Sequence, residues 1–285
     1  MVGYNHNSIN RGRDFRWPPI SKVTQDNNVM DTRVLVVGEV CSDVFIYGQA
    51  KRLCPDVPAP VFKTKRTVTN KGMAGNTAKN LEALGLKVDL ISQFQNITKT
   101  RYIDERQNYT FLRVDDEDEA VVMPLDASVI SDKEISEFDA VVISDYGKGF
   151  LSEADISRFC SNNKNTFLDT KKCIGTWCKD AAYIKINSPE YEAIKSRINT
   201  QGWINKLIVT LGDRGCMMMK EKGFSYYPVE KVDVFDLCGA GDSFLAALVA
   251  RYLDANNIDE AIAYANEKSS EVVQKKGVNV VSGTR

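Results

Sequence analysis

DLCGAGDSF, at residues 236–244, is the stretch on which the interpretation of this chain depends. Its small residues Gly239, Ala240 and Gly241 allow a ligand to approach the backbone closely. The apolar spacing that follows predicts a helix over residues 239–253, whose first turn presents unpaired N–H groups and the positive end of the helix dipole. We therefore expect an anion-binding site there. Asp242 lies beside it, kept ionised by the dipole and able to accept a proton from a bound hydroxyl.

Short apolar runs upstream of this stretch predict a buried sheet. Residues 34–37 are all apolar and are followed by Gly38, which is typical of a strand buried on both faces. Similar runs recur with helical stretches between them, so we expect an α/β fold with a central, mostly parallel sheet and helices on both faces. The expected strands are 34–37, 88–91, 140–143, 166–168, 183–186 and 207–210, and the expected helices are 74–84, 152–162, 188–198, 239–253 and 258–275.

Two further segments interrupt this alternation. Residues 57–68 and 109–123 contain β-branched residues and charges with no helical pattern, so we expect a small antiparallel β lid with strands roughly within 44–70 and 105–123. Residues 1–30 are rich in Asn, Arg and Pro without an apolar period, which predicts a flexible N-terminal extension. The remaining residues, 31–285, are expected to form one domain.

Composition excludes several classes of protein. The 285 residues carry 37 Lys and Arg against 38 Asp and Glu, so no global field favours nucleic acid or an anionic membrane. No apolar run approaches the ~18 residues that cross a bilayer and no secretory signal is found, so we expect a cytoplasmic protein. The seven cysteines show no CxxC spacing and the single histidine is His6. Carboxylates are therefore the expected proton acceptors.

The order of the motifs identifies a family. DxxGAGDSF, late in an α/β chain, closely resembles the C-terminal signature of the PfkB, or ribokinase-like, carbohydrate kinases. The other motifs follow in that family's order: Val37 to Asp43 resembles the opening strand, and Gly72 to Asn76 resembles the glycine-rich turn into a helix. Residues 187–190 (NSPE) resemble the Asn-x-x-Glu element, and residues 210–215 (TLGDRG) resemble the nucleotide-binding strand and turn.

This resemblance implies ATP and Mg²⁺ as cofactors and gives each motif a role. Asp242 would be the general base, and the amides of Gly239, Ala240 and Gly241 would hold the charge on the transferred group. Mg²⁺ would be placed through water by Asn187 and Glu190. The sugar would be held by Asp43, Gly72 and Asn76, and the nucleotide would be bound by Thr210, Gly212, Gly215, Asp236, Asn266 and Lys171.

A narrower resemblance concerns the acceptor. Residues 52–61 (RLCPDVPAPV), 104–107 (DERQ) and 144–149 (SDYGKG) look like the kinase domain of the bifunctional heptose enzymes, which phosphorylates D-glycero-D-manno-heptose 7-phosphate at its first carbon. Residues 169–171 (DTK) stand where those proteins carry Asp-Pro-Lys. A phosphorylated sugar needs cations, because they neutralise its phosphate. Asp145 joins the expected substrate-binding residues, and the candidate cations are Arg52, Arg106, Arg113 and Lys148.

Departures from the family pattern leave two alternatives open. The region 92–101 is shorter by about a helix, Cys238 replaces a usual Thr, and polar residues 268–270 follow Asn266. The alternatives are a kinase of an unphosphorylated sugar such as ribose or fructose, and a catalytically impaired protein that binds nucleotide or sugar. A dinucleotide-binding oxidoreductase is disfavoured because no GxGxxG follows the first strand. The sequence ends without the nucleotidyltransferase domain of the bifunctional enzymes, so we expect a one-step kinase, and the resemblance implies a homodimer through the lid.

Overall fold

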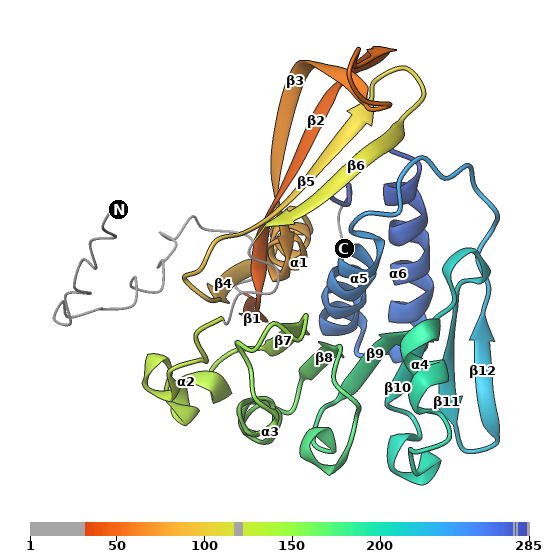
Figure 1. Ribbon diagram of the computed structural model, residues 1–285. Helices are drawn as coiled ribbons and strands as arrows, with labels where there is room; N and C mark the ends of the chain where they lie inside the picture. Colours follow the sequence, from red (N-terminus) through yellow and green to blue (C-terminus); the bar gives the residue numbers. More distant parts are fainter. Residues whose placement is uncertain (1–31, 117–121, 276, 278, 284–285) are drawn as a thin grey trace, which may run out of the picture.

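The computed structural model describes residues 32–116, 122–275, 277 and 279–283 (Figure 1). The predicted extension at residues 1–30 lies outside the described residues, as do residues 117–121 of the predicted lid segment. No helix in the described part of the chain is both long enough and apolar enough to span a bilayer.

The central sheet has eight strands in the order β12-β11-β10-β9-β8-β7-β1-β4. Neighbours from β10 to β4 pair in parallel, and β11 and β12 add an antiparallel edge. The predicted mostly parallel sheet is confirmed, including the fully buried strand that begins the core. The strands are β1 (Arg33–Gly38), β4 (Lys87–Ile91), β7 (Ala140–Asp145), β8 (Thr166–Thr170), β9 (Tyr183–Asn187), β10 (Leu207–Thr210), β11 (Cys216–Lys220) and β12 (Gly223–Tyr227).

Helices cover both faces of this sheet, as expected. On one face α1 (Ala74–Ala83), α5 (Ala240–Ala255) and α6 (Ile258–Val273) share an apolar core with the strands. On the other face lie α2 (Asp132–Ser136), α3 (Glu153–Asn162) and α4 (Ser188–Ile194) (Figure 1). The predicted helix at 188–198 ends early, at Ile194. Four short 3-10 helices complete the described elements: η1 (Ala127–Val129), η2 (Thr176–Cys178), η3 (Thr200–Trp203) and η4 (Gly212–Arg214).

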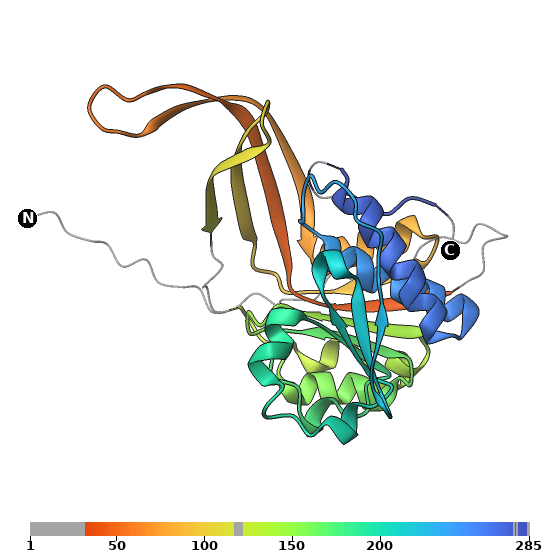
Figure 2. The same cartoon turned by 90° about the vertical axis from the view of Figure 1, so that its right-hand side faces the viewer.

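A second, four-stranded sheet rises from the edge of the core and forms the lid (Figures 1 and 2). Its strands, in spatial order, are β3 (Pro60–Met73), β2 (Val40–Leu53), β5 (Ile97–Asp104) and β6 (Tyr109–Asp116). The two outer pairings are antiparallel, as predicted, but β2 and β5 pair in parallel. The physical reason is that the chain returns to the core through α1 and β4 and then enters the lid a second time in the same direction as β2.

The topology brings two sets of backbone ends together. The carboxyl ends of β1, β7, β8, β9 and β10 lie on one edge of the central sheet, where ligands of open α/β sheets bind. Only one residue, Glu39, separates the end of β1 from the start of β2, so the base of the lid adjoins the same edge. The sugar-binding turn expected at Gly72 and the helix expected after Gly239 both belong to this region.

Candidate active site

The N-terminus of α5 is the centre of the site. Gly239 precedes the helix with a φ of 82°, a left-handed conformation that favours glycine, and Asp242 lies in the first turn. The amide of Ala240 donates to the Leu237 carbonyl oxygen at 3.3 Å, so one of the predicted anion-binding donors has an internal acceptor here. The 16-residue helix directs its positive end at the carboxylate in its own first turn.

Asp242 is a buried carboxylate with two hydrogen-bond donors. Only 5% of the residue is exposed. The Asn76 amide donates to Oδ2 at 2.9 Å and the Tyr146 hydroxyl donates to Oδ1 at 2.7 Å. Burial raises the pKa of Asp242 from 3.8 to about 6, and both hydrogen bonds act in the opposite direction. With this pKa the carboxylate is ionised at neutral pH, but its charged form is less stabilised than that of an exposed aspartate. It therefore takes up a proton more readily, which suits a proton acceptor.

A buried ammonium group lies next to this helix end. Lys185 on β9 forms an ion pair with Asp169 on β8, with 2.6 Å between Nζ and Oδ2. A Cβ atom added at Gly241 would lie 3.1 Å from Nζ, so the ammonium group reaches the first turn of α5. Burial acts to lower the pKa of Lys185, but the Asp169 carboxylate outweighs it and the pKa is raised. Lys185 therefore carries its charge beside the expected anion site.

The sugar-binding residues expected from the sequence lie together. A Cβ atom at Gly72 would overlap Asp43 Oδ2 and the Cys41 sulfur, so only glycine fits between the strands at this point. Gly72 lies two residues before the start of α1, whose Asn76 donates to Asp242. Asp43 is buried, and its Oδ1 accepts from Arg101 at 2.6 Å. Contacts thus run from Asp43 through this turn to the Asp242 carboxylate.

A cavity of about 530 Å³ opens at the same helix end. Its size is within the range of small-molecule sites. The Asn266 side chain holds one wall in place because its amide donates to the Tyr227 carbonyl oxygen at 2.9 Å. Four of the residues predicted to bind nucleotide line it together with Ala240 and Gly241: Thr210, Gly212, Gly215 and Asn266.

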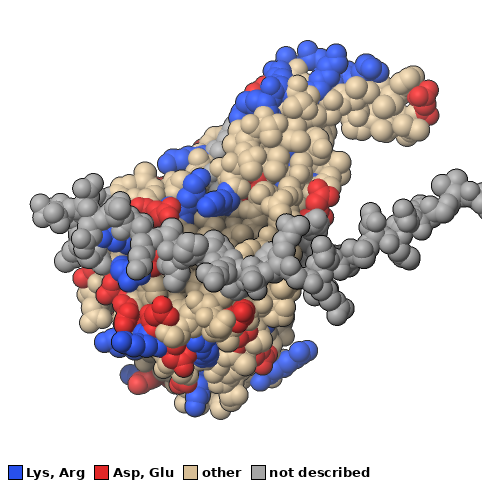
Figure 3. Space-filling model, turned by 90° about the vertical axis from the view of Figure 1, so that its left-hand side faces the viewer, with Lys and Arg blue, Asp and Glu red and all other residues tan. Residues whose placement is uncertain are grey.

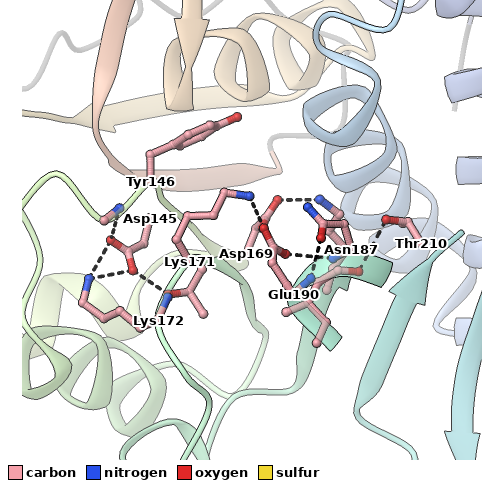
Figure 4. A network of polar contacts seen from close by, with 12 residues as sticks. Asp145, Tyr146, Asp169, Lys171, Lys172, Asn187, Glu190 and Thr210 are labelled. Carbon is pink, nitrogen blue, oxygen red and sulfur yellow. Dashed lines mark hydrogen bonds and ion pairs between the residues drawn. The ribbon is translucent and has the colours of Figure 1, made fainter. Parts of the chain in front are cut away.

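The ends of β7, β8 and β9 carry a polar network (Figure 4). Both oxygens of the Asp145 carboxylate lie 2.7 Å from Lys172 Nζ, so the Asp145 side chain is engaged in this ion pair. Lys171 pairs with Glu190. Glu190 and Asn187 form a capping box that begins α4, each side chain accepting from the other's backbone amide at 2.8 and 2.9 Å.

The carboxylate oxygens near Lys185 suit a divalent cation that is bound through water molecules. Asp169, Asp242 and Glu190 all act electrostatically on Lys185, and Lys171 pairs with Glu190, so these three carboxylates outnumber the two ammonium groups. Among the described residues, no three His, Cys, Asp or Glu side chains gather closely enough to chelate a metal directly. Mg²⁺ commonly keeps several waters and is shared with phosphate oxygens, which agrees with this arrangement.

Two of the other predicted residues, Arg52 and Arg106, lie apart from this centre. Arg52 is nine residues along β2 from Asp43, which corresponds to roughly 30 Å of strand. Arg106 is exposed in the turn between β5 and β6. The backbone amide of Lys148 donates to Glu39 at 2.9 Å. The Asp236 carboxylate accepts from the amides of Cys238 at 2.9 Å and Gly277 at 3.2 Å, which fastens the loop before α5.

Several residues of the site were not expected from the sequence. Glu39 is fully buried and accepts from the backbone amides of Tyr146 at 2.8 Å and Lys148 at 2.9 Å, which positions the Tyr146 hydroxyl. The sequence held a clue to two of them. Lys185 is a charged residue inside an apolar strand, and Glu39 is an acid that comes directly after the first apolar strand and its glycine. Tyr146 and Arg101 offered no such signal because their partners come from distant elements.

Comparisons with known proteins agree with this geometry. The sequence model of the family described as pfkB family carbohydrate kinase matches residues 95–284. The bifunctional protein HldE of Helicobacter pylori is 28% identical over 88% of this chain and 64% of its own length. HldE of Vibrio vulnificus is 27% identical over 87% of the chain and 61% of its own length. The chain thus spans less than two thirds of these curated relatives.

A solved structure with the same fold is the phosphofructokinase-2 of Escherichia coli in complex with potassium. The two sequences are 13% identical. The structural match covers 89% of this chain and 96% of the phosphofructokinase chain, with a TM-score of 0.66. The expected ribokinase-like fold is therefore confirmed.

The buried charge of Asp242 leads to a prediction about stability. Because the pKa is raised on folding, the folded state binds more protons between about pH 4 and 6, and stability falls as pH rises through that window. Asp242→Asn should therefore raise the free energy of unfolding at pH 8 by up to roughly 3 kcal/mol. Urea unfolding of both proteins at pH 4 and pH 8 measures this, and the difference should nearly vanish at pH 4. An equal effect at both values would contradict the raised pKa.

The Tyr146 hydroxyl should set the proton affinity of Asp242. Its hydrogen bond favours the ionised form, so Tyr146→Phe should move the pKa of Asp242 above about 6. ¹³C NMR of the labelled aspartate carboxylates across a pH series measures that value in each variant. Tyr226→Phe, at a residue that is 68% exposed, is the matched control and should leave it unchanged. A Tyr146→Phe protein with an unshifted Asp242 titration would show that the hydroxyl has no such role.

Proposed function

We propose that the chain, which belongs to the pfkB family of carbohydrate kinases, transfers the γ-phosphoryl group of ATP to a hydroxyl of a sugar phosphate. The first candidate acceptor is the C1 hydroxyl of heptose 7-phosphate. One observation carries the proposal: the buried carboxylate of Asp242 and the buried ammonium group of Lys185 meet at the first turn of α5, between the cavity and the turn at Gly72.

Phosphoryl transfer depends mainly on alignment and on neutralising charge. ATP in the cavity would direct its γ-phosphate at the N-terminus of α5, because the cavity is lined by Ala240 and Gly241. A sugar held against Asp43 would present a hydroxyl to Asp242, which accepts the proton as the oxygen attacks phosphorus. Lys185 and the amides of the first turn would meet the charge on the transferred group.

Mg²⁺ would be held through water by Asn187 and Glu190, and when bound it would neutralise part of the charge on the nucleotide phosphates. The capping box between these two residues keeps their oxygens at the carboxyl end of β9. Asp169 would keep Lys185 charged and directed at the helix end. The Asn76 and Tyr146 donors would fix the Asp242 carboxylate so that one orientation meets the acceptor.

The acceptor class is supported by two sets of similarities. The HldE proteins match most of this chain, and the motifs at residues 52–61 and 144–149 resemble those of heptose kinases. Pairing of two chains through the lid stays a prediction. It is consistent with the exposed apolar side chains of the lid, which include Leu53, Tyr109, Phe111 and Leu112.

A turnover assay tests the proposed function. ATP, Mg²⁺ and the full chain are incubated with one acceptor at a time: heptose 7-phosphate, fructose 6-phosphate, free heptose, ribose or fructose. ADP release measures turnover, and ³¹P NMR identifies the phosphorylated product. We expect ADP and a new C1 phosphate with heptose 7-phosphate. Asp242→Asn should lower turnover at least roughly a hundredfold while ATP still binds, because a positioned base contributes about that much.

Two outcomes would contradict the proposal in different ways. ADP release with free ribose or fructose and with no sugar phosphate would identify a kinase of unphosphorylated sugars. ATP binding by calorimetry with no turnover on any sugar would identify a binding protein that has lost catalysis.

A further inference from the structure

Asp242 has little free surface for an acceptor. Only 5% of the residue is exposed, and each carboxylate oxygen already accepts a hydrogen bond, Oδ2 from Asn76 at 2.9 Å and Oδ1 from Tyr146 at 2.7 Å. A general base must come within hydrogen-bond distance of the hydroxyl whose proton it accepts. An acceptor hydroxyl therefore reaches this carboxylate only when a neighbouring group makes room for it.

The Asn76 donor is firmly held. Asn76 is 1% exposed and lies in the first turn of α1. The Asn80 amide, one turn later, donates to the backbone oxygen of Asn76 at 2.8 Å and to its side-chain oxygen at 3.2 Å. Asn80 itself accepts from the Val281 amide at 2.9 Å. Moving the Asn76 side chain would break this buried network.

The Tyr146 donor is placed differently. Tyr146 directly follows β7, is half-buried and packs at the edge of the apolar core. Its backbone is fixed, because its amide donates to the buried Glu39 carboxylate at 2.8 Å. Gly147 has a φ of 70°, so the chain turns directly after Tyr146. The phenol ring can therefore rotate about its side-chain bonds while the backbone stays in place, which makes Tyr146 the more movable of the two donors.

The phenol also has the chemistry of an acceptor hydroxyl. Burial and the nearby Asp242 charge raise the pKa of Tyr146 well above its ordinary value. The proton in this hydrogen bond therefore stays on Tyr146, and Asp242 is the acceptor. A sugar hydroxyl would donate to the same carboxylate in the same way.

The Tyr146 ring borders both halves of the site. Lys171 Nζ lies 5.6 Å from the centre of the ring, and Lys171 pairs with Glu190 (Figure 4). The thiol of Cys41, which is two residues before Asp43 on β2, acts electrostatically on the phenol. The ring thus adjoins the expected nucleotide side through Lys171 and the expected sugar side through Cys41.

The basic side chains of the upper lid lie too far away to play this part. Figure 3 shows them gathered there. The exposed positions of β2 and β3 include Lys51, Arg52, Lys63 and Lys65. Arg52 is nine residues beyond Asp43, or roughly 30 Å of strand. The donor that meets Asp242 from the edge of the core therefore belongs to the turn after β7.

We propose that Tyr146 is a gating residue, whose hydroxyl occupies, in the empty site, the position on Asp242 Oδ1 that the acceptor hydroxyl takes during transfer. The proposal rests on the proposed function, and it names the residue that selects a sugar over water. A sugar held at Asp43 brings further contacts that offset the lost hydrogen bond, whereas water brings none. Water is therefore kept from the base when ATP is bound without a sugar.

Loss of the gate would allow ATP hydrolysis. A water oxygen would form a bond to the γ-phosphorus while the bond from that phosphorus to the ADP oxygen breaks. The proton of the water would pass to Asp242, and the products would be ADP and inorganic phosphate. This reaction needs no sugar, so it reports on the gate alone.

Release of inorganic phosphate from ATP and Mg²⁺ without any sugar tests the proposal. The full chain and Tyr146→Phe are compared at pH 8, well above the Asp242 pKa of about 6, so that the base is ionised. The variant keeps the ring but lacks the hydroxyl that holds it on the carboxylate. We expect Tyr146→Phe to release phosphate about 10-fold or more faster than the wild type, the scale of one hydrogen bond to a charged group.

Further variants show whether this hydrolysis passes through the gate. Tyr146→Met also lacks the hydroxyl and should give the same rise, whereas Tyr226→Phe, at a residue that is 68% exposed, should keep the wild-type rate. Adding Asp242→Asn to Tyr146→Phe should remove the rise, because the water then meets no base. Phosphate release at the wild-type rate in both Tyr146→Phe and Tyr146→Met would overturn the proposal.

Steady-state kinetics separates a gate from a merely structural role. With a sugar that the wild type phosphorylates, ADP and phosphorylated sugar should form in equal amounts in the wild type, whereas Tyr146→Phe should form an excess of ADP. The KM for the sugar should fall in Tyr146→Phe, because no hydrogen bond has to be broken first. A raised KM with equal amounts of the two products would identify a structural role and reject the gate.

The gate and the kinase fail separately. Sugar turnover by the wild type, with no rise in phosphate release in the Tyr146 variants, would reject the gate and keep the kinase. A rise that depends on Asp242, without phosphorylation of any sugar by the wild type, would keep the gate and reject the proposed acceptor.

Discussion

Burial of one carboxylate at the start of α5 is the constraint around which the other parts of the site are arranged. Asp242 leaves water and therefore holds its proton more strongly than an exposed aspartate. Its charge is tolerated because Asn76 and Tyr146 donate to it, Lys185 lies nearby and the helix dipole points at it. These partners come from α1, from the end of β7 and from β9, so the Asp242 carboxylate is held in place only when the whole core has folded.

The charged groups around the start of α5 are unequal in number. Near α5 the carboxylates of Asp169, Asp242 and Glu190 act on the ammonium group of Lys185. Lys171 also pairs with Glu190, so three carboxylates stand against two ammonium groups, an excess of negative charge that suits Mg²⁺.

The parts of the site that sequence predicted are those encoded locally. The first turn of α5 depends on Gly239 to Asp242 alone, so its position follows from residues that are adjacent in the chain. Lys185, Tyr146 and Arg101 were missed because each acts through a partner that the fold brings from another element. The parallel pairing of β2 and β5 was missed for the same reason, since it follows from the crossover through α1 and β4. Arg52 carried a motif resemblance, but the length of β2 takes it away from Asp43.

The account is tested most directly by a crystal structure of the chain grown with a non-hydrolysable ATP analogue and a sugar phosphate. It predicts the terminal phosphate of the analogue against Gly241 and Lys185, and a sugar hydroxyl within about 3 Å of the Asp242 carboxylate. A terminal phosphate bound away from the N-terminus of α5, or a sugar whose hydroxyls do not reach Asp242, would contradict it.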